Sequence, residues 1–379
     1  MTNARSRSMW MRIISSLSTG LAATALFGMA TAAIGCASSS GETVDSVALR
    51  AETPLPARAG TVIVDGCVLD TWQRATLAGP GAKRVLKDVI FLCLVPRLDG
   101  TVGPRDPSAL AHLDALSADL ATDGYRVSLA VSFTDETGQR YDGPQTRAFL
   151  ADPAWRARFG ETLVPALKSA MGVELDLQGM PGDARDVITA FVTEVSQIVR
   201  PAKRLGIFVP PSVTIPSDLP DGDAFERGAR ERIAAQVDRL RIMTLDFSDR
   251  DPGPTIDPGW AADAVRLAKR DAPAVDIAYP LYGTDFGPRG HRPTTYLEAI
   301  AIANVTGSPI QRGPTTASFV RYAAYGNEPH ELWFDDADST GRALSAWGYD
   351  TLPADVGVVF YGLGAEQPNL FETLAARMP

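Results

Sequence analysis

Near the middle of the chain, apolar and polar residues alternate over seven positions, residues 172–178. A strand with this sequence has valine and two leucines on one face and Glu174, Asp176 and Gln178 on the other. In an exposed antiparallel sheet the polar row would be the solvent face. In a parallel barrel the apolar row would pack on helices, and the polar row would lead to the C-terminal rim, where active sites lie. The rest of the chain favours the barrel.

Apolar segments of strand length alternate with segments of helical periodicity on both sides of this stretch. Strands are also predicted at residues 61–64, 88–95, 126–133, 205–210, 240–247, 275–282 and 356–361. Helices are predicted at residues 110–120, 145–170, 183–199, 224–237, 260–269, 339–347 and 369–377. Residues 285–334 contain Gly, Pro and His in place of a regular helix, which indicates an insertion.

Strands that alternate with helices predict a parallel sheet. Eight such units over residues 61–379, with the insertion 285–334 removed, fit a (β/α)8 TIM barrel with a small insertion after the seventh strand. A doubly wound open sheet would place a Gly-rich phosphate loop after the first strand, and residues 65–70 do not form one. The predicted fold class is therefore α/β, and the predicted architecture is the barrel.

The first 35 residues have the layout of a secretory signal, with three arginines before an uncharged apolar run. The run ends in Ala-Ile-Gly-Cys, which resembles the lipobox of bacterial lipoproteins and implies that Cys36 is lipidated and becomes the first mature residue. Ala33 stands where leucine is usual, so cleavage without lipidation and an uncleaved anchor are alternatives. Residues 36–60 are rich in Ser, Ala, Glu and Pro and are predicted to form a flexible tether.

A lipid on Cys36 would make the membrane a partner of the exported protein. The residue after the cysteine is Ala37 and not an aspartate, so we expect sorting to the outer membrane or the cell surface. The net charge of −9 becomes −12 once residues 1–35, with three arginines and no acid, are removed. Such a surface repels phosphate backbones, and no nucleic-acid partner is expected.

Histidine and cysteine are scarce in this sequence. His112, His291 and His330 lack the spacing of metal ligands, so we expect no metal site and no cofactor. Cys67 and Cys93 fall on strands that we predict to be neighbours. An exported protein can bridge two such residues, and buried free thiols are equally consistent with the pattern.

Six short segments carry a resemblance to a known family. They are residues 98–102, 128–132, 159–163, 243–246, 279–283 and 333–339. In this order they resemble the motifs of glycoside hydrolase family 18, the chitinase-like barrels. Residues 243–246 are similar to that family's Met-x-Tyr-Asp motif, and residues 279–283 to its Pro-x-Tyr-Gly motif. The resemblance extends over roughly residues 61–375 and implies a glycan as the partner.

The central motif departs from this family's pattern. The fourth strand of the family reads Asp-Gly-x-Asp-x-Asp-x-Glu, and alignment on Gly172 places Glu174, Asp176 and Gln178 at its last three polar positions. In active members the glutamic acid protonates the leaving oxygen, and the preceding aspartate orients the substrate's own acetamide. A neutral amide has no proton to give, so Gln178 cannot be that acid. General-acid assistance supplies about 10²–10⁴-fold in rate.

Two further departures fall in the same region. Leu245 replaces a tyrosine that holds the acetamide in the family, and Tyr361 replaces its usual tryptophan. The resemblance therefore implies a degenerate site in which the catalytic positions are Gln178, Asp176 and Asp246. We expect contacts with sugar from Glu174, Met243, Tyr282, Tyr361 and Trp72, with Trp260 as a further rim aromatic.

Three functions fit these observations. The first is an envelope-tethered barrel that binds a chitin-like or peptidoglycan-like glycan without efficient hydrolysis. The second is an active glycosidase that uses another acid, with Glu174, Asp183 and Asp285 as candidates, although Glu174 is deeper in the predicted strand and suits the polar interior. The third is a non-catalytic envelope scaffold. An open groove above Gln178 favours glycan handling, and a rim blocked by residues 285–334 favours the scaffold.

Overall fold

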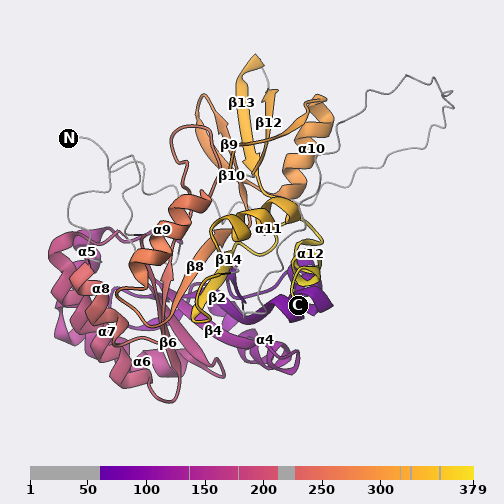
Figure 1. Ribbon diagram of the computed structural model, residues 1–379. Coiled ribbons are helices and arrows are strands. Elements are labelled where there is room, and N and C mark those ends of the chain that lie inside the picture. Colours follow the sequence, from indigo (N-terminus) through magenta and orange to yellow (C-terminus); the bar gives the residue numbers. More distant parts are fainter. Residues whose placement is uncertain are drawn as a thin grey trace, which may run out of the picture.

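Eight parallel strands close into a barrel in the computed structural model of the chain (Figure 1). The described residues are 60–135, 137–177, 179–211, 227–315, 317–324, 327–349 and 351–379. The predicted signal, Cys36 and nearly all of the predicted tether lie outside them, and so does Gln178. Within the described part of the chain, no helix is both long and apolar enough to cross a membrane.

The barrel confirms the predicted fold class. Its strands are β1 (Gly60–Asp65), β2 (Leu86–Pro96), β4 (Arg126–Ser132), β5 (Gly172–Asp176), β6 (Arg204–Val209), β7 (Arg239–Ile242), β8 (Val275–Pro280) and β14 (Val356–Tyr361). Pairing of β1 with both β2 and β14 closes the sheet. A short strand, β3 (Val102–Pro104), adds to β2 in the antiparallel sense.

Helices surround the barrel and cover the apolar outer face of its strands. They are α2 (Thr71–Ala78), α3 (Pro80–Val85), α4 (Leu110–Thr122), α5 (Gly143–Ala151), α6 (Pro153–Leu167), α7 (Arg185–Val199), α8 (Arg227–Ala234), α9 (Pro258–Ala268), α11 (Ala337–Ala346) and α12 (Leu370–Ala376). Val173, Leu175 and Leu177 lie in the core between strands and helices. The alternation in residues 172–178 therefore has the predicted direction, with Glu174 and Asp176 facing inward.

Local capping explains where the helices differ from prediction. The helix predicted at residues 145–170 is divided at Asp152, whose side chain caps α6 by accepting from the amide of Ala154. Helix α2, which begins with a capping box between Asp70 and Gln73, was not predicted from the sequence. The strand predicted at residues 240–247 ends earlier, at Ile242.

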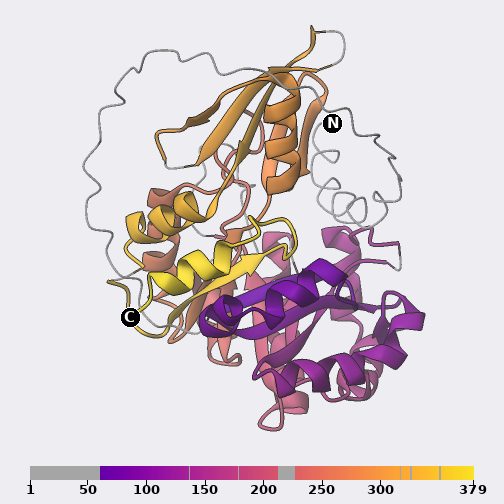
Figure 2. The same cartoon turned by 90° about the vertical axis from the view of Figure 1, so that its right-hand side faces the viewer.

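The insertion follows the seventh barrel strand, β8, as predicted. It is a five-stranded antiparallel sheet of β9 (Gly283–Gly287), β10 (Gly290–Thr294), β11 (Ile310–Arg312), β12 (Ser318–Ala323) and β13 (Pro329–Phe334), with one helix, α10 (Tyr296–Thr306). Figure 2 shows α10 lying along the sheet, which stands away from the barrel helices. Ala299 and Ala303 of α10 pack on Val320, Leu332 and Phe334.

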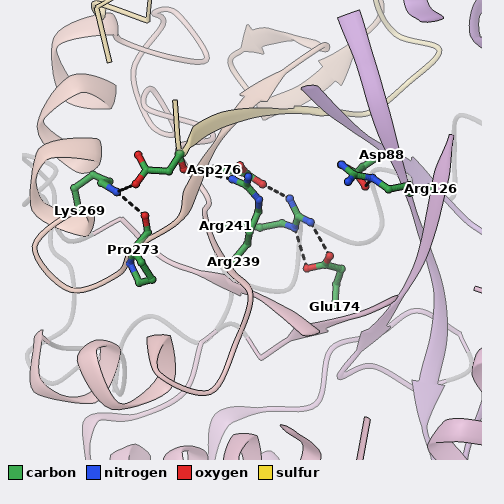
Figure 3. A network of polar contacts seen from close by, with 9 residues as sticks. Asp88, Arg126, Glu174, Arg239, Arg241, Lys269, Pro273 and Asp276 are labelled. Atoms are coloured by element: carbon green, nitrogen blue, oxygen red, sulfur yellow. Dashed lines mark hydrogen bonds and ion pairs between the residues drawn. The ribbon is translucent and has the colours of Figure 1, made fainter. Parts of the chain in front are cut away.

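An ion-pair network connects strands β5, β7 and β8 inside the barrel (Figure 3). Arg241 binds both carboxylate oxygens of Glu174 at 2.7 and 2.8 Å and also pairs with Asp276, which is held by Arg239 as well at 2.7 Å. A Cβ at position 206 would collide with the Glu174 carboxylate, so Gly206 makes room for the charged pair. Each buried charge in this network therefore has a partner, as burial requires.

A second set of pairs lies beside the first. The Asp88 carboxylate accepts from Arg126 at 2.6 Å and from Arg204 at 2.7 Å. These two arginines hold the pKa of Asp88 below its ordinary value against the opposing effect of burial, which is the largest single influence. The polar interior thus ties β2, β4 and β6 together below the functional end of the barrel.

Candidate functional site

The C-terminal ends of the strands bring a small set of side chains together. Asp65, Asp176 and Tyr361 are the last residues of β1, β5 and β14. Met243 follows β7 directly, and Tyr282 lies two residues after β8. This end of a (β/α)8 barrel carries the active site in characterised enzymes, because eight loops converge there.

An apolar surface forms the floor of the site. Met243 and Tyr361 pack on a cluster at the barrel centre that consists of Ile63, Ile90, Leu92, Ala130, Phe208 and Val359. The rings of Tyr282 and Tyr361 meet edge to face, with centroids 6.3 Å apart. Met243, Tyr282 and Tyr361 are all partly exposed, so a ligand can reach them. Aromatic faces of this kind pack on the C–H surfaces of sugar rings.

Asp246 lies over this floor in the loop after β7. Its backbone has φ +49°, and its Oδ1 accepts a 2.8 Å hydrogen bond from the Tyr282 hydroxyl. Burial raises the pKa of Asp246 to about 7, the Tyr282 hydrogen bond opposes the rise, and Asp249 adds to it. The Asp246 carboxyl can therefore take up and release a proton near neutral pH.

Asp176 is the second carboxylate of the site. It is 5% exposed, its Oδ1 has no hydrogen-bond partner among the described residues, and its Oδ2 lies 3.8 Å from Arg140. Across the site, Arg105 donates a 3.1 Å hydrogen bond to Asp65. Burial nevertheless raises the pKa of the Asp65 carboxyl above its ordinary value.

Tyr361 is surrounded by these charged groups. Burial raises the pKa of its phenol far above the ordinary value, and the carboxylates of Asp65, Asp176 and Asp246 raise it further, while Arg140 lowers it. The phenol therefore keeps its proton and can donate it in a hydrogen bond. These residues therefore lie close enough to act electrostatically on one hydroxyl.

Three of the residues predicted to contact sugar have other partners. Glu174 is 3% exposed and both of its oxygens bind Arg241, so it belongs to the barrel interior and does not present a free carboxylate to a ligand. Trp260 is buried in α9 and packs on Phe247 with ring centroids 5.5 Å apart. Trp72 is 39% exposed at the start of α2, where it hydrogen-bonds the Glu366 carboxyl.

The alternative acids proposed from the sequence are engaged in other contacts. Asp183 pairs with Arg147 at 2.6 Å on the surface. Asp285 is 2% exposed in the insertion and accepts hydrogen bonds from Tyr322 and His330. Their positions leave Asp65, Asp176 and Asp246 as the carboxyls that lie near Tyr361. Leu245 is buried and offers no polar atom to a ligand.

Three residues of the site were not predicted from the sequence: Asp65, Arg105 and Arg140. Asp65 directly follows the first predicted strand, and this position was the signal that could have identified it. The two arginines lie in loops without periodicity, and no pattern in the sequence indicates where those loops point.

A groove of about 790 Å³ runs between the loop after β7 and the insertion. The loop contributes Arg250 and Pro252, and the insertion contributes the ends of its two hairpins, including Phe286, His291, Arg321, Tyr322, His330 and Glu331. Asp249, in the same loop, acts electrostatically on both Asp246 and His291. The loop after β7 thus links the barrel site to the groove.

No protein-family model matches the chain. Over 233 residues it is 26% identical to YdhD of Bacillus subtilis, which carries the provisional name of a sporulation-specific glycosylase. The match spans 58% of this chain and 54% of that protein, so little more than half of the relative is represented.

Solved structures show the same fold. The spore cortex-lytic enzyme SleL of Bacillus cereus superposes with a TM-score of 0.69 at 17% identity, over 85% of this chain and 75% of SleL. A chitinase of Chromobacterium violaceum superposes with a TM-score of 0.67 at 19% identity, over 84% of this chain and 99% of the chitinase. The chain therefore has the chitinase-like (β/α)8 barrel that its motifs resemble. At these identities the likeness establishes the fold, and function rests on the site.

Proposed function

We propose that this protein binds a glycan containing N-acetylhexosamine units at the C-terminal end of its barrel and does not hydrolyse it efficiently. The observation that carries the proposal is the partly exposed floor of Met243 and Tyr361, flanked by Asp176 and Asp246. Similar proteins named as a chitinase, a cortex-lytic enzyme and a glycosylase support a glycan as the ligand class.

The site offers both kinds of contact that sugars need. Carboxylates accept hydrogen bonds from hydroxyl and amide N–H groups, and the phenol of Tyr361 donates one. The apolar floor contributes stacking area. Solvent reaches Met243, Asp246, Tyr282 and Tyr361, which favours a ligand site over a scaffold with a blocked rim.

Two residues in the sequence support the proposed loss of hydrolysis. Gln178 stands at the position of the proton donor, and an amide cannot protonate a leaving oxygen at neutral pH. Leu245 stands where a tyrosine would hold the substrate's acetamide, and its buried hydrocarbon side chain has no hydrogen bond to offer. The retained Asp176 orients an acetamide but cannot by itself supply both functions.

Residual hydrolysis is the second candidate, because Asp246 has a pKa raised to about 7 and can hold a proton. If Asp246 serves as the acid, cleavage has a pH optimum below about 7, and Asp246→Asn abolishes it without abolishing binding. A rate that is independent of this substitution contradicts that role.

We also propose that the barrel is held at the cell envelope through a lipid on Cys36. The support is the signal-like sequence of residues 1–35 and the cysteine that follows them. A tether of some two dozen residues would leave the barrel free to reach a polymer near the membrane.

A glycan array probed with the full chain, followed by a cleavage assay on each glycan bound, tests the proposal. We expect retention on arrays of N-acetylhexosamine oligomers and no release of shorter products over hours. Tyr361→Ala should abolish retention. Tyr349 is buried and packs on Trp347, and Tyr349→Phe should leave retention unchanged. Absence of any bound glycan contradicts the proposal.

A further inference from the structure

Arg140 lies at the edge of the site, where it pairs with Asp176 across a gap too long for a hydrogen bond. Its side chain is 21% exposed, and its closest carboxylate oxygen, Oδ2 of Asp176, is 3.8 Å away, beyond hydrogen-bond distance. The guanidinium makes no hydrogen bond to any described residue. Arg105, on the other side of the site, donates directly to Asp65 at 3.1 Å. A guanidinium has five N–H donors, so most of the hydrogen-bonding capacity of Arg140 is available to a ligand.

The turn that carries Arg140 is held by its own hydrogen bonds. The Asp135 carboxylate accepts from the amides of Thr137 and Gln139, both at 2.9 Å, and from the Thr137 hydroxyl at 2.6 Å. A bridge between Thr134 and Arg140 closes the turn onto the end of β4. The backbone of Arg140 is thereby held at the end of β4, which limits the ordering that binding of a ligand requires.

Further polar atoms near Arg140 lack partners. Ser132 is the register neighbour of Asp176 on β4, and its hydroxyl has no hydrogen-bond partner in the described part of the chain. The same is true of the Thr134 hydroxyl and of Oδ1 of Asp176, and all three residues are at most 5% exposed. Buried polar groups are nearly always hydrogen-bonded, so these unpartnered atoms at the ends of β4 and β5 suit hydrogen bonds to a ligand.

The groove beside the insertion also contains basic side chains. Its lining includes Arg250, Arg321, His291 and His330, but Arg321 pairs with Glu331 at 2.7 Å and burial lowers the pKa of His291, so Arg250 supplies the positive charge. His330 is held through its Nδ1 by the buried Asp285 carboxylate at 3.0 Å, which leaves Nε2 as its other polar atom. Because Arg250 is four residues beyond Asp246, the two Cα atoms are at most about 14 Å apart. The groove therefore begins close to the site along the loop after β7.

We propose that the glycan carries carboxylate groups and that Arg140 selects it by pairing with one of them. This inference rests on the proposed function and narrows its ligand to an acidic N-acetylhexosamine polymer. A guanidinium binds a carboxylate through two parallel hydrogen bonds, which gives both strength and direction. Arg250 receives a further carboxylate along the chain. A neutral polymer would leave Arg140 with only the more distant Asp176 carboxylate, at 3.8 Å, as an ionic partner.

The carboxylate can come from a lactyl ether on the amino sugar or from a uronic acid between amino sugars, and both present the same group to Arg140. Three labelled oligomers of equal length distinguish these sources from a neutral chain. They are an N-acetylglucosamine oligomer, an alternating N-acetylglucosamine–N-acetylmuramic acid oligomer without peptide, and an N-acetylglucosamine–glucuronic acid oligomer. The methyl ester of the muramic acid oligomer controls for shape.

Equilibrium binding of the full chain to these four probes tests the inference. We expect the acidic oligomer that fits the site to bind about tenfold or more tightly than its ester and the neutral oligomer, as charge-assisted hydrogen bonds require. Arg140→Gln should remove this preference and Arg140→Lys should retain part of it. Arg147→Gln, which alters an exposed pair with Asp183, is the matched control and should leave it unchanged.

The possible failures separate the two proposals. If wild-type protein binds the acidic oligomers and the neutral probes equally, the charge inference is wrong and the proposed function stands. If Arg140→Gln folds normally by circular dichroism and keeps the preference, Arg140 is not the selecting residue. If no oligomer binds, both the inference and the proposed function are wrong.

Discussion

The Tyr282 hydroxyl donates a hydrogen bond of 2.8 Å to Oδ1 of Asp246, which joins the loop after β8 to the loop after β7. Burial raises the pKa of Asp246 to about 7, and the hydrogen bond keeps the pKa from rising further. The site thus contains one carboxyl that is partly protonated at neutral pH. This property affects both the stability of the protein and its chemistry.

The raised pKa of Asp246 predicts how stability depends on pH. Between its ordinary value of 3.8 and about 7, the folded state binds this proton more tightly than the unfolded state does. Stability therefore falls as pH rises through that range. Asp246→Asn removes the effect. The free energy of unfolding of this variant minus that of wild type should rise from near zero at pH 4 to at most about 4 kcal/mol at pH 8.

Urea unfolding at pH 5, 6.5 and 8 measures this difference. Asp263→Asn, in an exposed pair with Arg266, is the matched control and should show no comparable trend. A difference between Asp246→Asn and wild type that is constant over this pH range would show that Asp246 titrates normally.

Arg241 predicts a large loss of stability on substitution. Arg241→Met leaves the Glu174 and Asp276 carboxylates buried without their shared partner, and we expect a loss of about 3–5 kcal/mol in the free energy of unfolding. Arg232→Met removes an exposed pair with Asp186 and should cost less than about 1 kcal/mol. Equal effects of the two substitutions in denaturant titrations would contradict the structural role of the network.

The barrel could be predicted because its strands and helices alternate strongly in the sequence, and the inward direction of Glu174 followed from the alternation in residues 172–178. The partner of Glu174 could not be predicted, since Arg241 lies 67 residues away and is brought near only by barrel closure. Arg140 was missed for a similar reason. It lies in a turn, and its nearness to Asp176 depends on the pairing of β4 with β5.

The end of β7 shows a different limit of sequence reasoning. Residues 240–247 are predicted as one strand, but the strand ends at Ile242 and Asp246 has a positive φ of 49°. Such a conformation is uncommon for a residue with a side chain, and it arises from the tertiary contacts of the loop. Asp246 could thus be assigned to the site from its motif, but its contact with Tyr282 required the structure.

The two cysteines of the barrel predict a thiol count. Cys67 and Cys93 are both free and buried, and the Cys67 thiol contacts the Cys93 carbonyl oxygen at 3.4 Å. The neighbouring Cys67 and burial raise the pKa of the Cys93 thiol, which slows its reaction. We expect little reaction with a thiol reagent before unfolding and two thiols after it. A bridged pair, seen as a mobility shift on reduction, would contradict this.

Cys36 adds a separate prediction for the intact protein in a bacterial host. Wild-type protein should partition into the detergent phase of a detergent extraction, and its Cys36 thiol should be blocked. Cys36→Ser should leave the protein unprocessed or free of lipid, while Cys67→Ser should not change its partitioning. Recovery of wild-type protein in the aqueous phase would contradict a lipid anchor.

The central claim is that the barrel keeps a glycan site but lacks a proton donor at position 178. Gln178→Glu restores a carboxyl there, and Leu245→Tyr restores the hydroxyl that holds the acetamide in the family. A carboxyl near Asp176 in a partly desolvated site should have a raised pKa, as a general acid requires. Gln178→Met combined with Leu245→Tyr is the matched control, since it has no proton to give.

The most direct measurement is the release of a chromophore from an N-acetylglucosamine oligomer by wild type and by these two double variants, with binding measured in the same samples. We predict weak but measurable release by Gln178→Glu/Leu245→Tyr, none by the control variant, and binding without release by wild type. Release by wild type at a rate comparable to that of the restored variant would contradict the account and show that another carboxyl is the acid.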